Sequence, residues 1–289
     1  MGFEQPVVVF GTGRSGTTIF HQMLSHHSGL AWLSALASRY PDRLALNGAL
    51  MRAVDHPLLE KLLRRKYPPD ESYEFWEHYA PGFAEPCRDL LDSDLSRKVQ
   101  EHLQVAFRRI VKPPRDRLLL KITGWPRLRY LSALFDRPKY IHIVRDGRAV
   151  VNSLLHVNFW RGWRGPWNWR WGPLSPQYEA EWEGYNRSFV VLAAIQWKIL
   201  MDAAEEATHA VGADNVLEIR YEDLCADPIA EHQRAAEFAG LKWSAGFQSE
   251  LTFYRLRNKN SKWQTDLTAQ QRSALEDVLG PYLERFGYS

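Results

Sequence analysis

A buried strand that leads into a glycine-rich turn and then into a helix is the strongest constraint on this chain. Four apolar residues, Val7–Phe10, are followed directly by the turn Gly11–Gly16 and by a predicted helix from Thr17 to about His26. Such a turn points several backbone N–H groups at one spot beside the positive end of the helix dipole. The segment therefore predicts an α/β fold with a binding site for a phosphate-like anion.

The spacing of the turn fits a Walker A loop at all positions but one. Gly11 and Gly16 bracket four residues, and Thr18 takes the hydroxyl position. Thr17, however, stands where the lysine that clamps the β- and γ-phosphates is required. The cation of this loop is instead Arg14, which favours a short phosphate or sulfate group over a metal-bound triphosphate.

A dinucleotide-binding loop also fits in part, because Gly11, Gly13 and Gly16 match the G-x-G-x-x-G pattern. That pattern needs an acidic residue about 20 positions further on to bind the ribose. The stretch 30–36 contains none. The glycines therefore favour an anion site that is not a dinucleotide site.

Length and composition fit an ordinary globular domain. The chain has 289 residues, 45% of them hydrophobic, and a net charge of +3, which is too weak to indicate nucleic-acid binding. Cys87 and Cys225 lack metal-ligand spacing and are expected to be free, buried thiols in a reducing compartment. The first strand begins near residue 7, and no apolar run reaches 18 residues, so we expect neither a secretory signal nor a transmembrane helix. These features predict a cytoplasmic, single-domain protein over residues 1–289.

Short apolar runs that alternate with helical patterns predict a parallel sheet covered on both faces. We expect further strands over 118–122, 140–144 and 216–219, and helices over 127–135, 149–156 and about 181–210. Ligands of such sheets bind at the carboxyl ends of the strands. Arg14, Lys121 and Arg145 all lie at or just past a predicted strand end, so they are expected to converge on one crevice.

Two segments depart from this alternation. Residues 40–115 are predicted to be mostly helical and to form an insertion or cap on the sheet. Residues 158–178 carry a group of tryptophans among glycines and prolines, and are predicted to form a long ordered loop: Trp160, Trp163, Trp167, Trp169 and Trp171. These aromatic rings have two open interpretations, stacking on an acceptor molecule or anchoring a lid to the core.

A second set of polar residues also follows predicted strands. Arg145 ends one strand, and Ser153 lies one to two turns into the helix that follows, so the pair can bind one phosphate from two sides. Tyr221 comes just past another strand, within the stretch Tyr221–Leu224. Near the C-terminus stands Asn260–Trp263.

These blocks together resemble the PAPS-dependent sulfotransferase family, whose donor is 3′-phosphoadenylyl sulfate (PAPS) and whose nucleotide product is adenosine 3′,5′-bisphosphate (PAP). The run from Leu120 through Arg145–Ala149 to Ser153, and the stretch Ser261–Trp263, are most similar to the tyrosylprotein sulfotransferase branch and its bacterial relatives. The matching blocks spread from residue 7 to the C-terminus, over about half the chain.

The resemblance implies a P-loop-type parallel sheet and transfer of a sulfuryl group from PAPS to a hydroxyl or amine, with no metal. Lys121 would stabilise the leaving oxygen, Arg14 the phosphosulfate, and Ser261 and Lys262 would close over the nucleotide. The acceptor stays open between a small molecule, a glycan, a lipid and a peptide. The resemblance also implies that Arg14, Lys121 and Ser261 take part in the transfer step. The implied nucleotide contacts are Gly13, Arg14, Ser15, Gly16, Thr17, Thr18, Arg145, Ser153, Tyr221, Ser261 and Lys262.

The family's catalytic base is missing from its expected places. The tyrosylprotein branch has a glutamate shortly after the first helix, where this chain has Trp32–Ala35, and the cytosolic branch has a histidine where this chain has Thr123. Glu77, His78 and Glu85 are the candidates for the base. Two other functions stay open: a P-loop kinase, which would need Mg²⁺ and the absent lysine, and a nucleotide-binding module without catalysis.

Overall fold

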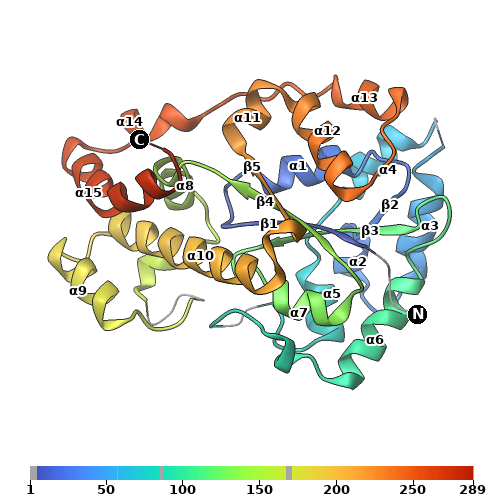
Figure 1. The fold of residues 1–289 in the computed structure, drawn as a ribbon, viewed down its shortest axis with the longest axis horizontal. Helices are drawn as coiled ribbons and strands as arrows, with labels where there is room; N and C mark the ends of the chain where they lie inside the picture. Colours follow the sequence, from blue (N-terminus) through green and yellow to red (C-terminus); the bar gives the residue numbers. More distant parts are fainter. Residues whose placement is uncertain (1–4, 57, 85–86, 167–170, 289) are drawn as a thin grey trace.

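Five parallel strands form the centre of the molecule (Figure 1), and the computed structural model describes residues 5–56, 58–84, 87–166 and 171–288. The strands lie in the order β2-β3-β1-β4-β5, and every neighbouring pair is parallel. They are β1 (Val7–Gly11), β2 (Leu30–Trp32), β3 (Arg117–Thr123), β4 (Lys139–Val144) and β5 (Val216–Arg220). The predicted α/β fold with a parallel sheet is confirmed, and β2 is a strand that the sequence analysis did not predict.

The register of the sheet brings the ends of its three central strands together. Gly11 of β1 pairs with Thr123 of β3, so the glycine turn leaves the sheet beside the last residue of β3. On the other side Phe10 pairs with His142 of β4, two residues before that strand ends. The turn after β1, Lys121 and Arg145 therefore lie along one edge of the sheet.

Helices cover the sheet because its strands are almost entirely apolar; Val7, Val8 and Val9 are fully buried. The first helix, α1 (Thr17–Leu24), follows the glycine turn. Between β2 and β3 the chain forms helices that lie toward the right and bottom of Figure 1: α2 (Ala35–Arg39), α3 (Ala45–Ala53), α4 (Glu60–Lys66), α5 (Tyr73–Tyr79), η1 (Asp92–Asp94) and α6 (Arg97–Arg108).

The remaining helices follow β3, and α10 packs against α7, α8 and α15. They are α7 (Leu128–Leu134), α8 (Gly147–Leu155), η2 (Gly162–Arg164), α9 (Pro176–Gly184), α10 (Phe189–Val211), η3 (Ala213–Asn215), α11 (Tyr221–Ala226), α12 (Pro228–Ala239), α13 (Ala245–Leu251), η4 (Asn260–Lys262), α14 (Trp263–Asp266) and α15 (Ala269–Arg285). In the described part of the chain, none of the helices combines the length and the apolar character needed to cross a lipid bilayer.

Two expected elements differ in the structure. The helix expected over 181–210 is two helices, α9 and α10, because Asn186 and Arg187 adopt the left-handed conformation (φ 52° and 56°) and end the first. The segment 158–178 is not all loop, since it contains η2 and the first turn of α9; Trp167 and Trp169 lie outside the described residues.

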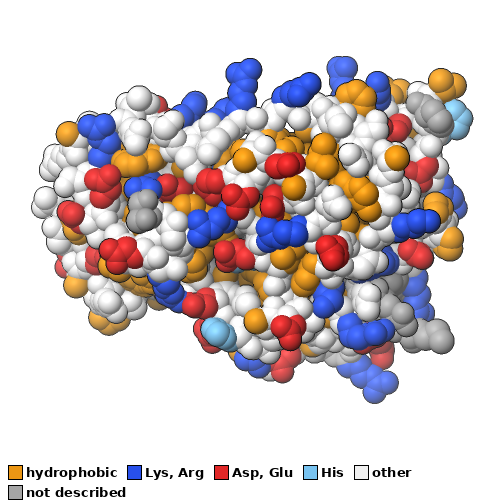
Figure 2. Space-filling model, turned by 45° about the horizontal axis from the view of Figure 1, so that its top comes forward, with side chains coloured by type: hydrophobic (Ala, Val, Ile, Leu, Met, Phe, Trp, Pro, Cys, Tyr) orange, Lys and Arg blue, Asp and Glu red, His pale blue; other side chains and the backbone are white. Residues whose placement is uncertain are grey.

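The two cysteines also differ from expectation. Both are free, but Cys87 is exposed and Cys225 is only half-buried, so neither is the fully buried thiol that was expected. On the face shown in Figure 2, basic side chains of the described residues are interspersed with acidic and hydrophobic ones.

Buried histidines make the fold sensitive to acid. His142 stacks on Phe10 with ring centroids 4.5 Å apart, and His232 stacks on Phe20. Burial lowers the pKa of each histidine from 6.5 to about 4.

Below pH 6.5 the unfolded chain therefore binds more protons than the folded protein does. The free energy of unfolding should fall as the pH drops from 6.5 towards 4, and the loss at pH 5 should be roughly 2 kcal/mol per histidine. Urea unfolding at pH 7.5 and pH 5 measures this loss. The His142→Phe variant should lose less stability between the two pH values than the wild type, and an equal loss would contradict the assignment.

Candidate functional site

The glycine turn after β1 packs against the ring of Tyr221 at Gly16. Gly16 has φ 102°, and a Cβ at that position would lie 2.5 Å from Cδ2 of Tyr221, so only glycine allows this approach. Helix α1 begins without a side-chain cap, which leaves the N–H groups of its first turn open to a ligand. The hydroxyl of Ser15 is buried and has no hydrogen-bond partner among the described residues. Open backbone donors and an unpaired hydroxyl fit a phosphate-like or sulfate-like anion.

Two arginines meet at this turn. Arg14 takes the left-handed conformation (φ 58°) and donates from Nε to Oγ of Ser153 at 2.9 Å. Arg145 donates to the carbonyl oxygen of Arg14 at 2.9 Å, and its guanidinium carbon lies 4.3 Å from the centre of the Tyr221 ring. Burial lowers the pKa of Arg145, although it remains far above neutrality as a guanidinium. The structure thus brings together four residues that the sequence analysis drew from three separate blocks.

Asn260, from the C-terminal block Asn260–Trp263, contacts one of these arginines. Its side-chain oxygen accepts from Nε of Arg145 at 2.9 Å, and its amide nitrogen donates to Glu222. Ser261 and Lys262 follow in η4, where both are exposed and η4 packs against α8. They follow directly on Asn260, the residue of this block that contacts Arg145.

Lys121 lies at the carboxyl end of β3 and is only 6% exposed. Its Nζ donates to Oγ1 of Thr18 at 2.8 Å and lies 3.1 Å from Oε1 of Glu71. The same carboxylate oxygen accepts from Oγ1 of Thr123 at 2.7 Å. A buried ammonium is stable here because a carboxylate compensates its charge.

Glu71 is the functional candidate that the sequence analysis missed. Pro69 forms an antiparallel bridge with Ser34, and the N–H of Asp70 donates to the carbonyl of Leu33 at 2.9 Å. These contacts hold the segment that carries Glu71 against the end of β2, the region where the family's glutamate is absent from this chain. The sequence signal was weak: a Pro-Pro pair followed by two acidic residues before a helix.

Two of the three candidates for the base lie outside the cavity that contains Lys121. Both Glu77 and His78 are exposed, and neither lines the cavity that contains Lys121. The carboxylate of Glu77 accepts backbone N–H bonds from Gly82 at 2.8 Å and Ala84 at 3.2 Å, so it has a local structural role. Glu85 lies outside the described residues. Among the described residues, Glu71 just before α5 and Tyr73 at its start line the cavity, whereas Glu77 and His78 further along the helix do not.

A cavity of about 330 Å³ adjoins these groups. The glycine turn and the start of α1 line one part of it, together with Lys121 and Glu71. The other part is lined by aromatic side chains from the segment after α8 and by residues of β3 and α10. The cavity thus joins the anion-binding turn to a space that can hold a second molecule.

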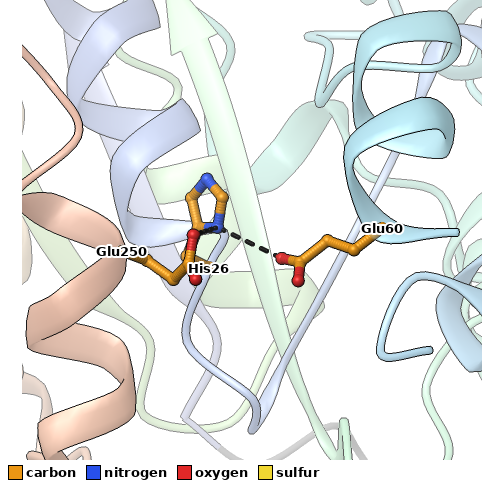
Figure 3. A group of neighbouring side chains, drawn as sticks. All are labelled: His26, Glu60 and Glu250. Carbon is orange, nitrogen blue, oxygen red and sulfur yellow. Dashed lines mark ion pairs between the residues drawn. The ribbon is translucent and has the colours of Figure 1, made fainter. Parts of the chain in front are cut away.

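A second polar cluster lies at the other end of α1 (Figure 3). Nδ1 of His26 is 3.5 Å from Glu60 and 3.6 Å from Glu250, and Tyr254 lies 3.0 Å from the other ring nitrogen. Burial and the nearby Arg64 lower the pKa of His26 to about 3, so the ring is neutral. Arg64 pairs with Glu60 at 2.9 Å and supplies the counter-charge. This cluster is separate from the cavity beside Lys121, and we assign it no part in catalysis.

The parallel sheet, the glycine turn on its central strand and the cations at its edge define a P-loop-type α/β protein. A family model described as the sulfotransferase family matches residues 6–245, so the chain belongs to the sulfotransferase family. It is accordingly a sulfotransferase enzyme.

Individual proteins that are similar to this chain are also named sulfotransferases. The omega-hydroxy-beta-dihydromenaquinone-9 sulfotransferase of Mycobacterium tuberculosis is 25% identical over 321 residues, which cover 99% of this chain and 76% of the relative. Protein-tyrosine sulfotransferase A of Caenorhabditis elegans is 31% identical over 123 residues, 39% of this chain and 24% of that protein. The fold is similar to the crystal structure of the sulfotransferase STF9 from Mycobacterium avium, with a TM-score of 0.65 at 18% identity over 100% of this chain and 78% of that one.

Proposed function

We propose that this chain transfers the sulfuryl group of PAPS to a hydroxyl group and releases PAP. The observation that carries the proposal is the position of Lys121, whose ammonium lies between Thr18 at the start of α1 and the carboxylate of Glu71. A cation beside the anion-binding turn and a base beside that cation are the two groups that sulfuryl transfer needs.

The nucleotide end of the site follows from the contacts described above. The N–H groups of Gly13–Thr18 and the side chain of Arg14 would bind the 5′-phosphosulfate. Arg145 and Ser153 would bind the 3′-phosphate, and the ring of Tyr221 would contact the adenine. Ser261 and Lys262, which follow Asn260 on η4, would cover the nucleotide.

The proposed transfer step uses Glu71 and Lys121, which contact each other beside the anion-binding turn. Glu71 takes the proton of the acceptor hydroxyl as the acceptor oxygen forms its bond to sulfur. The bond between sulfur and the bridging phosphate oxygen breaks, and Lys121 stabilises the negative charge that this oxygen gains. The loose, in-line transition state of phosphoryl transfer is the model for this step. Hydroxyl acceptors are favoured because the two relatives are named for a hydroxylated menaquinone and for protein tyrosine.

Calorimetric titration with PAP, and with ATP plus Mg²⁺, tests the donor. The proposal expects tight binding of PAP without metal, together with release of PAP from PAPS when a phenol is supplied. Phosphorylation by ATP would favour the P-loop kinase. PAP binding without transfer to any of a set of phenols and alcohols would favour a binding module without catalysis.

Replacing Arg145 by alanine should weaken PAP binding by about 10- to 100-fold, because a charge-assisted hydrogen bond to the 3′-phosphate is lost. Adenosine 5′-phosphate, which has no 3′-phosphate, is the matched control ligand. Its affinity should fall much less, since it never made that contact. Calorimetry with both ligands measures the difference, and equal losses would show that Arg145 only supports the fold of the turn.

A further inference from the structure

Aromatic side chains line the same cavity as the glycine turn. Phe159, Trp160 and Trp171 line it together with Tyr73 and Leu154. Phe159 is 61% exposed, whereas Trp160 is only 8% exposed, so the first lies at the rim and the second within the wall. Flat aromatic faces in a narrow space favour a flat, apolar ligand.

The position of Trp160 is fixed by its neighbours. A Cβ on Gly162 would overlap the indole ring, so the glycine allows the ring to lie directly on the backbone. Nε1 of Trp160 donates to Oε1 of Gln196 at 2.9 Å. The ring is therefore held from two sides and is a fixed surface of the cavity.

This hydrogen bond also orients Gln196. An indole N–H can only donate, so it selects the carbonyl oxygen of the amide and turns the NH₂ group away from the ring. Gln196 is only 3% exposed and lines the cavity. Within the described ranges its NH₂ group donates to no other residue. Because Gln196 lines the cavity, an oxygen atom of a ligand bound there can accept a hydrogen bond from this NH₂ group.

The charges among the described residues that line the cavity disfavour one class of acceptor. Lys121 and Glu71 form an ion pair, and Arg14 is proposed to bind the phosphosulfate, which leaves the positive charge of Arg161. A ligand with an ammonium group would be repelled by this guanidinium. Amine acceptors and basic peptides are therefore disfavoured.

From this geometry we infer that the acceptor is a neutral aromatic alcohol that carries a second oxygen able to accept a hydrogen bond from Gln196. The inference rests on the proposed function, because the hydroxyl must reach Glu71 and the sulfuryl group. The rings of Trp160 and Trp171 bind the flat body of the acceptor, and the amide of Gln196 recognises its second oxygen. Gln196 is thus a specificity residue, and it takes no part in the transfer itself.

Two bicyclic phenols of similar size form a matched pair of probes. 7-Hydroxycoumarin has a phenolic hydroxyl and a lactone carbonyl, whereas 2-naphthol has the hydroxyl alone. Each is titrated by calorimetry into the protein saturated with PAP, at a pH where both phenols are protonated. The wild type should bind 7-hydroxycoumarin about tenfold more tightly than 2-naphthol. Tyramine, which carries an ammonium group, should bind more weakly than either.

The Gln196→Glu variant removes the NH₂ donor but keeps an oxygen for the indole of Trp160. Its preference for 7-hydroxycoumarin should fall to about one, while 2-naphthol binds as before. Gln196→Met, of similar length, should behave in the same way. The affinity for PAP and the melting temperature, measured on the same samples, establish that each variant is folded.

Each result of this experiment decides one question. Equal binding of the two phenols by the wild type, an unchanged preference in Gln196→Glu, or tighter binding of tyramine would overturn the inference while PAP binding leaves the proposed function in place. Failure of the wild type to bind PAP would overturn the proposed function, and with it the inference.

Discussion

The Glu71→Gln variant should have a kcat about 10²- to 10⁴-fold below that of the wild type, because a positioned general base contributes a factor of this size. The amide keeps the shape of the side chain and can still accept the hydrogen bond from Thr123, which is 2.7 Å from the carboxylate. It cannot take the proton of the acceptor hydroxyl. The affinity for PAP should stay close to that of the wild type, since Glu71 contacts Lys121 and Thr123, and neither is among the residues proposed to bind the phosphates. Initial rates with PAPS and a phenol, together with calorimetry for PAP, measure both quantities.

A series of phenols of increasing acidity makes this test specific for proton transfer. An acidic phenol such as 4-nitrophenol is largely ionised and needs little help from a base, so the defect of Glu71→Gln should shrink with it and be largest with unsubstituted phenol. Glu77→Gln is the matched control, since that carboxylate is exposed on α5 and bonds only to nearby backbone N–H groups in the described structure. A defect of equal size with every phenol, or a strong defect in Glu77→Gln, would contradict the role of Glu71.

The Lys121→Ala variant should lose about 10²- to 10³-fold in kcat, which is the usual effect of removing one donor that stabilises charge in the transition state. Its affinity for PAP should fall far less, because the glycine turn and Arg145 bind the phosphates independently of Lys121. The physical reason is that the bridging oxygen gains its charge only as the bond to sulfur breaks. Single-turnover rates with saturating PAPS separate this effect from binding.

Lys121 is also part of the core, which calls for a second variant. The side chain is 6% exposed, so alanine leaves a cavity in the sheet as well as removing the charge. Lys121→Met fills the same space without the ammonium. It should be more stable to heat than Lys121→Ala and equally slow. Recovery of the wild-type rate in Lys121→Met would show that Lys121 supports packing alone.

Much of the proposed nucleotide site could be predicted because its residues belong to local patterns. The strand before Gly11, the glycine turn and the helix after it are consecutive in the chain, and Lys121 and Arg145 stand at or just past the ends of apolar runs. Parallel strands bring their carboxyl ends to one edge of the sheet, so the positions of these residues in the sequence were enough to predict that they lie close together. The contact of Tyr221 with Gly16 follows from the same rule, since Tyr221 comes directly after β5.

The proposed base, Glu71, could not be predicted in this way. Glu77 and His78 were chosen for their residue types, and nothing in the sequence indicated that α5 turns them away from the cavity. The position of Glu71 depends on the bridge between Ser34 and Pro69, a pairing of irregular segments without periodicity. The break between α9 and α10 was not predicted for a related reason. The left-handed conformations of Asn186 and Arg187 do not change the spacing of apolar residues from which the helix over 181–210 was predicted.

The order of residues along the chain determined the sheet, the anion-binding turn and the cations beside it, because each of these depends on neighbours in sequence and on the fixed geometry of strand and helix. Only the tertiary structure decided which carboxylate contacts Lys121 and which amide contacts Trp160 in the cavity. Those contacts join segments that are distant in sequence, and they exist only after packing has excluded water and matched each buried charge or donor to a partner.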